Sequence, residues 1–434
     1  MSAFDVAAIL VAAAAVFGYM NHRFVRLPAT TGTLLVALVS SLALVIVERL
    51  LPGLELRAAM EGFVGEIDFN QTLLRGMLCF LLFAGALHVD LDGLIEHKWV
   101  IAGLATVGVA LSVSVVGLLT WWAFGALGVD ISLLACFTFG ALISPTDPIA
   151  VMGLLKELRA PRSLEAQIAG ESLFNDGVGV VVFMALASMA QLTGGDVEGP
   201  GAGATALIAF AAREVIGGLA LGLALGYSGY RALKSINDHP LELLITLALV
   251  MFTYAASFWM HVSGPIAVVI AGLFIGNPGR RLAMSDRTRE HIDAFWSMID
   301  GVLNAVLFLL LGIEVFAVSH WSEVLLPAAL VVPICLVARY VSVAMPVGAM
   351  RVRGPLQRGL VPILAWSGLR GGISVALVLA LPPFPARDLL LASTYAVVVF
   401  SVFAQGLTVR RLLLYYGVGG GEDGAGHGPH AAGT

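Results

Sequence analysis

The sequence predicts an all-α, polytopic membrane protein, and three observations favour this class. Of the 434 residues, 59% are hydrophobic and only 12% are charged, about half the charged share of a typical soluble domain. The mean hydropathy is +0.93. Apolar runs of roughly 20 residues, enough for an α-helix to cross a bilayer, follow one another along nearly the whole chain. A single integral membrane domain over 1–416 is therefore expected.

Apolar runs between polar breaks predict thirteen transmembrane helices. The first run lacks a basic segment ahead of it and contains Asp5, so we expect a retained helix rather than a cleaved signal peptide. The short ninth run opens with Gly264-Pro265, so its limits are the hardest to draw. The thirteen expected spans are 3–20, 29–48, 70–88, 98–125, 132–154, 168–192, 204–230, 240–258, 262–276, 293–317, 322–346, 358–381 and 388–409.

The distribution of Lys and Arg predicts the orientation of these spans. When the loops are assigned alternately to two sides, 17 of the 24 basic residues fall on one side and five on the other, including span ends. The other two, Arg339 and Arg370, lie within spans. Basic residues concentrate in cytoplasmic loops. We therefore expect a protein of the cell inner membrane with its N-terminus outside and its C-terminus in the cytoplasm.

The C-terminal segment 417–434 reads GVGGGEDGAGHGPHAAGT and has no apolar periodicity. A disordered cytoplasmic tail is expected here, with no soluble regulatory domain. No nucleotide-binding fingerprint or P-loop follows the last span, so energy would come from an ion gradient, or the protein would conduct passively. We also expect no enzymatic activity, no cofactor and no nucleic-acid partner.

The fifth span is interrupted by polar residues and two prolines at SPTDP. Pro145 and Pro148 each remove a backbone donor and disturb the preceding turn. Carbonyl groups freed around Ser144 to Asp147 cannot remain unpaired in hydrocarbon. A hard cation such as Na⁺ prefers oxygen ligands, so these carbonyls, Thr146 and Asp147 form a candidate site. The alternative is a proline kink with a capping aspartate.

The sixth span contains two carboxylates, an amide and a hydroxyl in the stretch GESLFNDG. Ser172 and Asp176 are four residues apart and share one helix face, while Glu171 and Asn175 share the adjoining face. A charged group at the centre of a span costs roughly 2.5–3.5 kcal/mol on insertion scales, so such residues need partners or a function. This cluster predicts an ion site.

The twelfth span contains Arg370 beside Gly368, Gly371 and Gly372, and Arg339 lies in the eleventh. These glycines predict a second broken helix. Spans five and twelve are seven apart, so the two segments cross the membrane in opposite directions. Such an arrangement is typical of inverted six-helix repeats, with the ion site where the two broken helices cross near the membrane centre.

Five stretches in this order resemble NhaP-like sodium/proton exchangers of the monovalent cation:proton antiporter family 1. They are ISPTDPIAV, GESLFNDG, FLLLGIEV, LVARYVSV and WSGLRGGISVALVLALP, and the similarity runs from about span two to span thirteen. The resemblance implies thirteen helices in inverted repeats, a homodimer in membrane lipid, and a moving core. That core would take parts of 70–192 and 293–409, with dimerisation spans elsewhere.

The resemblance also implies the roles of individual residues. Na⁺ would lie among Thr146, Asp147, Ser172 and Asp176, with Asp176 the carboxylate that Na⁺ and H⁺ share. The residues implied to support the site are Glu171 paired with Arg339, together with Asn175, Arg370 and, from the helix break itself, Ser144. One departure is Ala84, which stands where many relatives carry a glutamate in span three.

The expected function is therefore secondary active antiport of Na⁺ against H⁺ for pH homeostasis and sodium transport. Competition of both ions for Asp176 would couple them by alternating access, in an electroneutral 1:1 exchange. The transported ions would be Na⁺ or Li⁺ and H⁺. The alternatives are a K⁺/H⁺ antiporter of the same fold or a passive cation channel, which would need carbonyls or carboxylates around an open axis.

Overall fold

The computed structural model describes residues 3–27, 29–50, 76–190, 192, 204–280, 284–313, 321–350 and 359–418. Within these ranges the fold is entirely helical, apart from one isolated β-bridge between Asp147 and Leu369. The protein is therefore a polytopic helical membrane protein, as the hydropathy predicts. The proposed tail at 417–434 lies outside the described residues except for Gly417 and Val418, and Val418 is buried.

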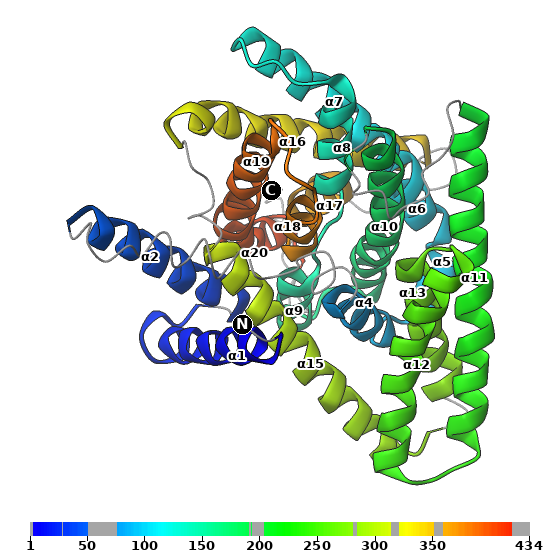
Figure 1. Cartoon of the computed structure of the whole chain (residues 1–434). Coiled ribbons are helices and arrows are strands. Elements are labelled where there is room, and N and C mark those ends of the chain that lie inside the picture. The colour runs from blue at the N-terminus through cyan, green and yellow to red at the C-terminus, as the bar shows by residue number, and fades with distance from the viewer. Residues whose placement is uncertain are drawn as a thin grey trace, which may run out of the picture.

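The N-terminal half of the chain contains the following helices, of which Figure 1 labels the α-helices. The π-helical segment η4 continues α6 into α7 without a break. The bounds are α1 Ala3–Met20, η1 Asn21–Val25, α2 Ala29–Leu50, α4 Leu78–Leu87, α5 Leu91–Glu96, α6 Lys98–Gly103, η4 Leu104–Gly108, α7 Val109–Ala126, α8 Leu133–Ile143, α9 Ile149–Glu157 and α10 Arg162–Met189.

The C-terminal half also contains α-helices continued by π-helical segments: η5 extends α13, and η8 extends α19. The bounds are α11 Ala204–Lys234, α12 His239–Met260, α13 Gly264–Phe274, η5 Ile275–Gly279, α15 Asp286–Ile313, α16 Trp321–Met350, α17 Leu360–Ser367, α18 Gly372–Leu379, α19 Arg387–Phe400, η8 Ser401–Gln405 and α20 Gly406–Tyr415.

Eight helices in the described part of the chain are long and apolar enough to cross a membrane. They cover Asp5–Val25, Lys98–Ala126, Arg162–Met189, Ala209–Lys234, His239–Met260, Arg287–Leu310, Val324–Met350 and Arg387–Tyr415. Large apolar side chains such as Trp122, Trp259 and Phe252 are exposed on their outer surfaces. Helices that are apolar on all sides are typical of contact with lipid.

Two of the predicted spans are broken into half-helices. The fifth comprises α8 and α9, separated by residues 144–148, and the twelfth comprises α17 and α18, separated by residues 368–371. The prolines of the first break and the glycines of the second cause these interruptions, as their positions in the sequence predict. We call residues 144–148 and 368–371 together the crossing.

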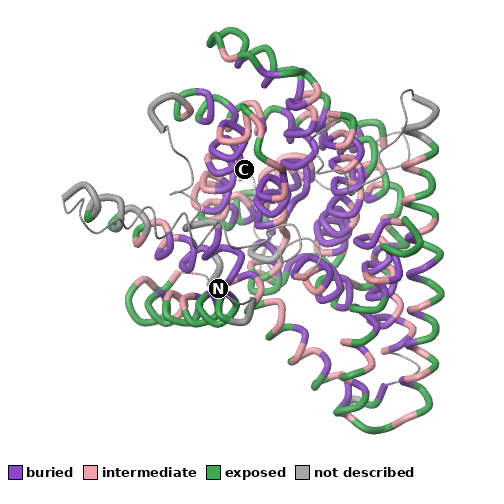
Figure 2. The backbone as a smooth tube through the Cα atoms, in the orientation of Figure 1, coloured by how far each residue is buried: buried purple, intermediate pink, exposed green. Residues whose placement is uncertain are grey.

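The helices pack as two groups around the crossing. Helices α7, α8, α10, α16, α17, α18 and α19 contact one another and form what we call the crossing bundle. Helices α4, α11, α12 and α13 pack together, and α15 joins them to α1 and α2; these form the flanking bundle. Figure 2 shows burial concentrated in α8, α10 and the α17–α19 segment, whereas α1 and α11 present exposed faces.

Glycines allow the flanking helices to approach closely. A Cβ atom at Gly222 of α11 would lie 2.4 Å from the backbone oxygen of Ala267 in α13. Small residues at helix interfaces are the usual means of close packing in membranes, where apolar association alone provides little driving force. The flanking bundle is thus a tightly packed wall beside the crossing.

Candidate cation site at the crossed helix breaks

The crossing is held together by a backbone hydrogen bond between the two breaks. The Asp147 N–H donates to the Leu369 carbonyl oxygen at 2.7 Å. Gly371 makes this approach possible, since a Cβ there would lie 2.6 Å from both Cβ and Oδ2 of Asp147. Residues far apart in the sequence are thereby brought into a single irregular segment inside the protein.

Arg370 occupies the carbonyl groups that the prolines release. Its Nη1 donates to the carbonyl oxygen of Ser144, and to that of Pro145 at 3.0 Å. Its own backbone N–H donates to Ser401 Oγ at 2.7 Å. The positive guanidinium therefore caps the carbonyl end of α8, where the helix dipole is negative. Arg370 thus provides these two carbonyls with a partner that the sequence did not reveal, and the prediction that they contact a cation stays a prediction.

Thr146 is bonded to two residues of α10. Its backbone N–H donates to Asn175 Oδ1 at 3.3 Å, and Asn175 Nδ2 donates to Thr146 Oγ1 at 2.8 Å. The hydroxyls of Thr146 and Ser172 share a hydrogen bond of 3.0 Å. All three side chains are buried. This network fixes the first break against α10 and determines where Asp147 and Asp176 lie.

Glu171 and Arg339 form a buried ion pair, as expected. Both terminal nitrogens of the guanidinium donate to the two carboxylate oxygens, one of them at 2.9 Å. Arg339 Nη2 also donates to the Leu364 carbonyl oxygen at 2.8 Å, which ties α10 and α16 to α17. Such bidentate pairing balances the two charges in the buried interior, although Arg339 Nε has no hydrogen-bond partner in the described residues. Glu171 is therefore occupied by a partner within its own bundle.

Asp176 differs from Glu171, the other buried carboxylate of α10. It is only 6% exposed, and its Oδ1 has no hydrogen-bond partner in the described part of the chain. Leaving such an oxygen unpaired costs free energy unless a ligand satisfies it. Asp176 lines a cavity of about 1000 Å³ together with Thr146 and Asp147, so its carboxyl group lies at the wall of a space large enough for ions.

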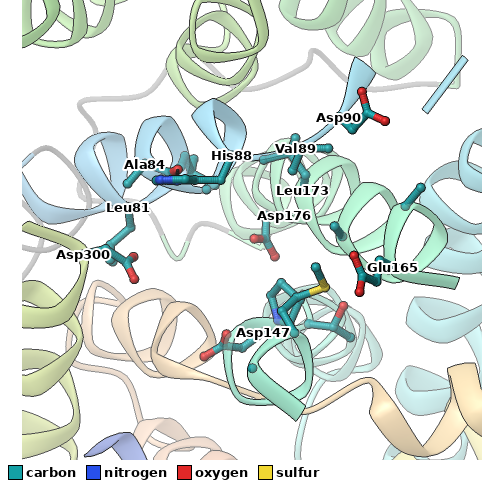
Figure 3. A pocket seen from close by; sticks show the side chains of 18 of the residues that line it. Leu81, Ala84, His88, Val89, Asp90, Asp147, Glu165, Leu173, Asp176 and Asp300 are labelled. Carbon is teal, nitrogen blue, oxygen red and sulfur yellow. Dashed lines mark hydrogen bonds between the residues drawn. The ribbon is translucent and has the colours of Figure 1, made fainter. Parts of the chain in front are cut away.

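The cavity is strongly acidic, as Figure 3 shows for several of its residues. Lys156 and Arg162 are the basic side chains in its wall, beside His88 and His97. Concave sites with charge of one sign concentrate counterions. The described residues include no group of three or more His, Cys, Asp or Glu placed to hold a metal ion. The acids lining the cavity are Asp90, Asp92, Glu96, Asp147, Glu165, Asp176 and Asp300.

The structure does not bring every expected ligand to the cavity. Asp147, Asp176 and Thr146 line it, whereas Ser172 and Asn175 lie behind Thr146 in the hydrogen-bond network. Ala84 lines the same cavity, so this side of span three contributes no carboxylate at that position. The candidate ligands thus come from the first break and α10 of the crossing bundle.

The sequence analysis missed Asp300 and Asn304, which lie on α15 and also line the cavity. The signal available was a carboxylate and an amide one helical turn apart inside an apolar span. A second missed group is Glu242, buried at the start of α12, where it accepts a hydrogen bond from Thr288 Oγ1 at 2.8 Å. Glu242 does not line the cavity and joins α12 to α15.

Broken helices that cross around a buried carboxylate define a class, the polytopic ion transporters of the membrane. A family model described as "Sodium/hydrogen exchanger, transmembrane" matches residues 10–415, and the chain belongs to this family. It is 44% identical to the Na⁺/H⁺ antiporter NhaP of Pseudomonas aeruginosa, over 94% of this chain and 96% of that protein. It is 35% identical to the Na⁺/H⁺ antiporter NhaH of Halobacillus dabanensis, over 87% and 92% respectively.

The fold is also found in a solved structure, that of the sodium proton antiporter MjNhaP1 from Methanocaldococcus jannaschii at pH 8. The TM-score is 0.74 over 95% of this chain and 97% of that one, at 16% sequence identity. At this identity the comparison concerns the fold alone. The resemblance to NhaP-like exchangers inferred from the five stretches is confirmed by the family and its relatives.

The Glu171–Arg339 pair yields a prediction for stability. Glu171→Ala and Arg339→Ala should each destabilise the protein by about 3–5 kcal/mol, because each leaves its partner charged and unpaired in the interior. The double variant should lose much less than the sum, since it removes both charges. Thermal unfolding of the purified protein in detergent measures this coupling.

A matched control is the pair of Glu157 and Arg410, whose nitrogen and oxygen lie 3.4 Å apart on the surface with more than half of each side chain exposed. The same three alanine variants there should shift the unfolding temperature little, because exposed pairs contribute at most about 1 kcal/mol. Additive losses at Glu171 and Arg339 would contradict the pairing.

Proposed function

We propose that this protein is a secondary active antiporter that exchanges Na⁺ for H⁺ at Asp176. The observation that carries the proposal is a buried carboxylate whose Oδ1 has no hydrogen-bond partner in the described residues and which faces an acidic cavity. Either ion satisfies such an oxygen, and a single carboxylate cannot hold both at once. The names of the similar Pseudomonas and Halobacillus proteins support the choice of ions.

Charge balance supports coupling between the two ions. Three carboxylates, Asp147, Glu171 and Asp176, lie with Arg339 and Arg370 in the crossing bundle, which gives a formal charge of −1. One Na⁺ or one H⁺ neutralises it, and a neutral site crosses a low-dielectric barrier at lower cost than a charged one. A site that moves only when neutral exchanges one cation for another.

The packing supports alternating access as the mechanism. The cavity lies between α10 and the first break of the crossing bundle on one side and α4 and α15 of the flanking bundle on the other. We propose that the crossing bundle moves as a body against the flanking bundle, with the ion at Asp176. The proposal includes thirteen spans in inverted six-helix repeats, broken in spans five and twelve, because this architecture permits such a movement around a fixed site.

We further propose a homodimer in a cell inner membrane, with the N-terminus outside and the C-terminus in the cytoplasm. The basic residues support this orientation, since Lys156 and Arg162 lie at the cavity and belong to the side with 17 of the 24 basic residues. The cavity would then open to the cytoplasm. Thr146 and Ser172 would contribute oxygen near the ion, with Asn175 and Arg370 supporting them.

The proposed exchange is tested directly in proteoliposomes with a trapped pH dye. Na⁺, Li⁺ and K⁺ are added one at a time, and proton movement is recorded for each. A response to Na⁺ and Li⁺ is expected. Proton movement with K⁺ alone would replace the proposal by K⁺/H⁺ antiport, and ion currents without saturation would indicate a passive channel.

Asp176→Asn should abolish exchange and leave the protein folded, because the amide is isosteric but cannot be shared between Na⁺ and H⁺. Thermal unfolding reports the fold, and the dye assay reports transport. Asp90→Asn is the matched control, since it removes a charge from the same cavity while asparagine still caps α5 through the Asp92 N–H. Substantial exchange by Asp176→Asn would show that another group couples the ions.

The apparent KM for Na⁺ should rise as pH falls, because protons and Na⁺ compete for Asp176. Where the site is mostly protonated, competition by mass action makes KM rise about tenfold for each pH unit. Initial rates are measured over a range of Na⁺ concentrations with equal pH on both sides of the membrane. A KM that is constant across three pH units would exclude simple competition.

Exchange should be electroneutral, because Asn175 cannot titrate and Arg339 and Arg370 remain charged throughout. One proton then leaves as one Na⁺ enters. A membrane potential acts with about 2.3 kcal/mol per elementary charge per 100 mV, so a cycle that moves net charge would respond strongly. The measurement is Na⁺-driven proton movement at clamped potentials of either sign. A rate or end-point that follows the potential would implicate a second titrating group, with Asp147 the first to test.

A further inference from the structure

Asp300 is a carboxylate in an apolar helix, and the mechanism above does not use it. It lies on α15 in the flanking bundle and lines the cavity with Ser297, Asn304 and Leu307. Figure 3 shows its carboxylate, with those of Asp147 and Asp176, around the same space. A charge within a span requires a partner or a function.

Asn304, one helical turn later, holds this carboxylate in place. Its Nδ2 donates to Asp300 Oδ1 at 3.1 Å and to the Asp300 carbonyl oxygen at 2.9 Å. Asn304 is 6% exposed, so the amide itself is fixed. In the described part of the chain no basic side chain forms an ion pair with Asp300. A cation in the cavity would therefore balance the charge of the Asp300 carboxylate.

The acids that face Asp300 belong to the other bundle. Asp147 lies close enough for its charge to interact with that of Asp300. Asp176, also in the cavity wall, contributes the buried oxygen without a hydrogen-bond partner. Carboxylates that face one another across a partly desolvated space repel, and a cation between them removes that cost. A cation or a proton at the Oδ1 atom of Asp176 would satisfy an oxygen that has no hydrogen-bond partner in the described residues.

Asp300 has a distinct place on its own side of the cavity. Among the described cavity residues of α4 and α15 it is the only carboxylate, since α4 contributes Leu81, Leu82, Ala84 and Gly85. The basic side chains of the wall, Lys156 and Arg162, come from the end of α9 and the start of α10, outside the flanking bundle. The flanking wall thus offers a cation one anionic group.

We propose that Asp300 is a second cation-binding carboxylate, which holds a hard monovalent cation in the cavity before the ion passes to Asp176. The inference rests on the proposed function. Because Asp300 belongs to the flanking bundle, it does not travel with the ion. It therefore raises the local concentration of Na⁺ at the open site without changing the number of charges that each cycle moves.

This role predicts that loss of Asp300 changes the apparent KM for Na⁺ but not the maximal rate. Asp300→Asn should raise the apparent KM for Na⁺ roughly tenfold, because one anionic group is lost near the ion path. The maximal rate should stay near that of the unaltered protein, since Asp176 still couples the ions. Asp300→Glu, which retains the charge, should restore most of the affinity. Exchange by all variants should remain insensitive to membrane potential.

The test uses the full-length protein in proteoliposomes, with initial rates measured against Na⁺ at low ionic strength. Glu290→Gln is the matched control: Glu290 is an exposed carboxylate on the same helix and lies outside the cavity wall. Its KM should change little. Thermal unfolding of each variant verifies the fold, and Asp300→Glu serves as the second variant should Asp300→Asn be unstable.

The outcomes separate the inference from the proposed function. If the unaltered protein exchanges Na⁺ for H⁺ and Asp300→Asn has the same KM, the inference alone is overturned. A lost maximal rate in folded Asp300→Asn would also overturn it, because Asp300 would then belong to the coupling site. If Asp300→Glu binds Na⁺ as weakly as Asp300→Asn, the charge is not responsible. Failure of the unaltered protein to exchange these ions removes the proposed function itself.

Discussion

The arrangement of the whole site depends on Arg370 and the carbonyl end of α8. Two prolines release backbone oxygens at the centre of an apolar protein, where unpaired carbonyls carry a large free-energy cost. The guanidinium of Arg370 meets the oxygens of Ser144 and Pro145, and the Asp147 N–H meets that of Leu369. The break in one helix is thus stabilised by the break in the other. Neither break would be tolerated alone, so the two half-helix pairs form a single structural unit.

Around this unit the buried polar groups divide into satisfied and unsatisfied ones. Glu171 has Arg339, and Thr146 has Asn175 and Ser172, so these residues fix geometry. Asp176 is the one buried carboxylate in the described residues that retains an oxygen without a hydrogen-bond partner, and a cation or a proton would satisfy it.

The cavity lies between the two bundles, and the two sides of its wall differ in their acidic residues. The crossing bundle provides Asp147 and Asp176, and the flanking bundle provides Asp300 opposite an otherwise apolar α4 surface. The overall fold persists in MjNhaP1 at 16% identity with a TM-score of 0.74, so packing of the helices tolerates extensive substitution. In this protein Ala84 of α4 and Asp300 of α15 line the same cavity, so the carboxylate of this wall comes from α15.

The sequence by itself determined the class of the protein, the two helix breaks and the buried residues of α10, because these follow from local rules. Apolar length predicts membrane helices, proline and glycine interrupt them, and a charge in an apolar span indicates a partner or a site. The sequence could not determine which backbone oxygens at the first helix break already accept hydrogen bonds from other side chains. The carbonyl oxygens of Ser144 and Pro145 accept hydrogen bonds from Arg370, which lies 226 residues after Ser144 in the chain. Likewise Asp300 gained significance only when α15 came to line the same cavity as Asp147. Such pairings depend on long-range packing, and local sequence patterns do not predict which distant segments contact one another.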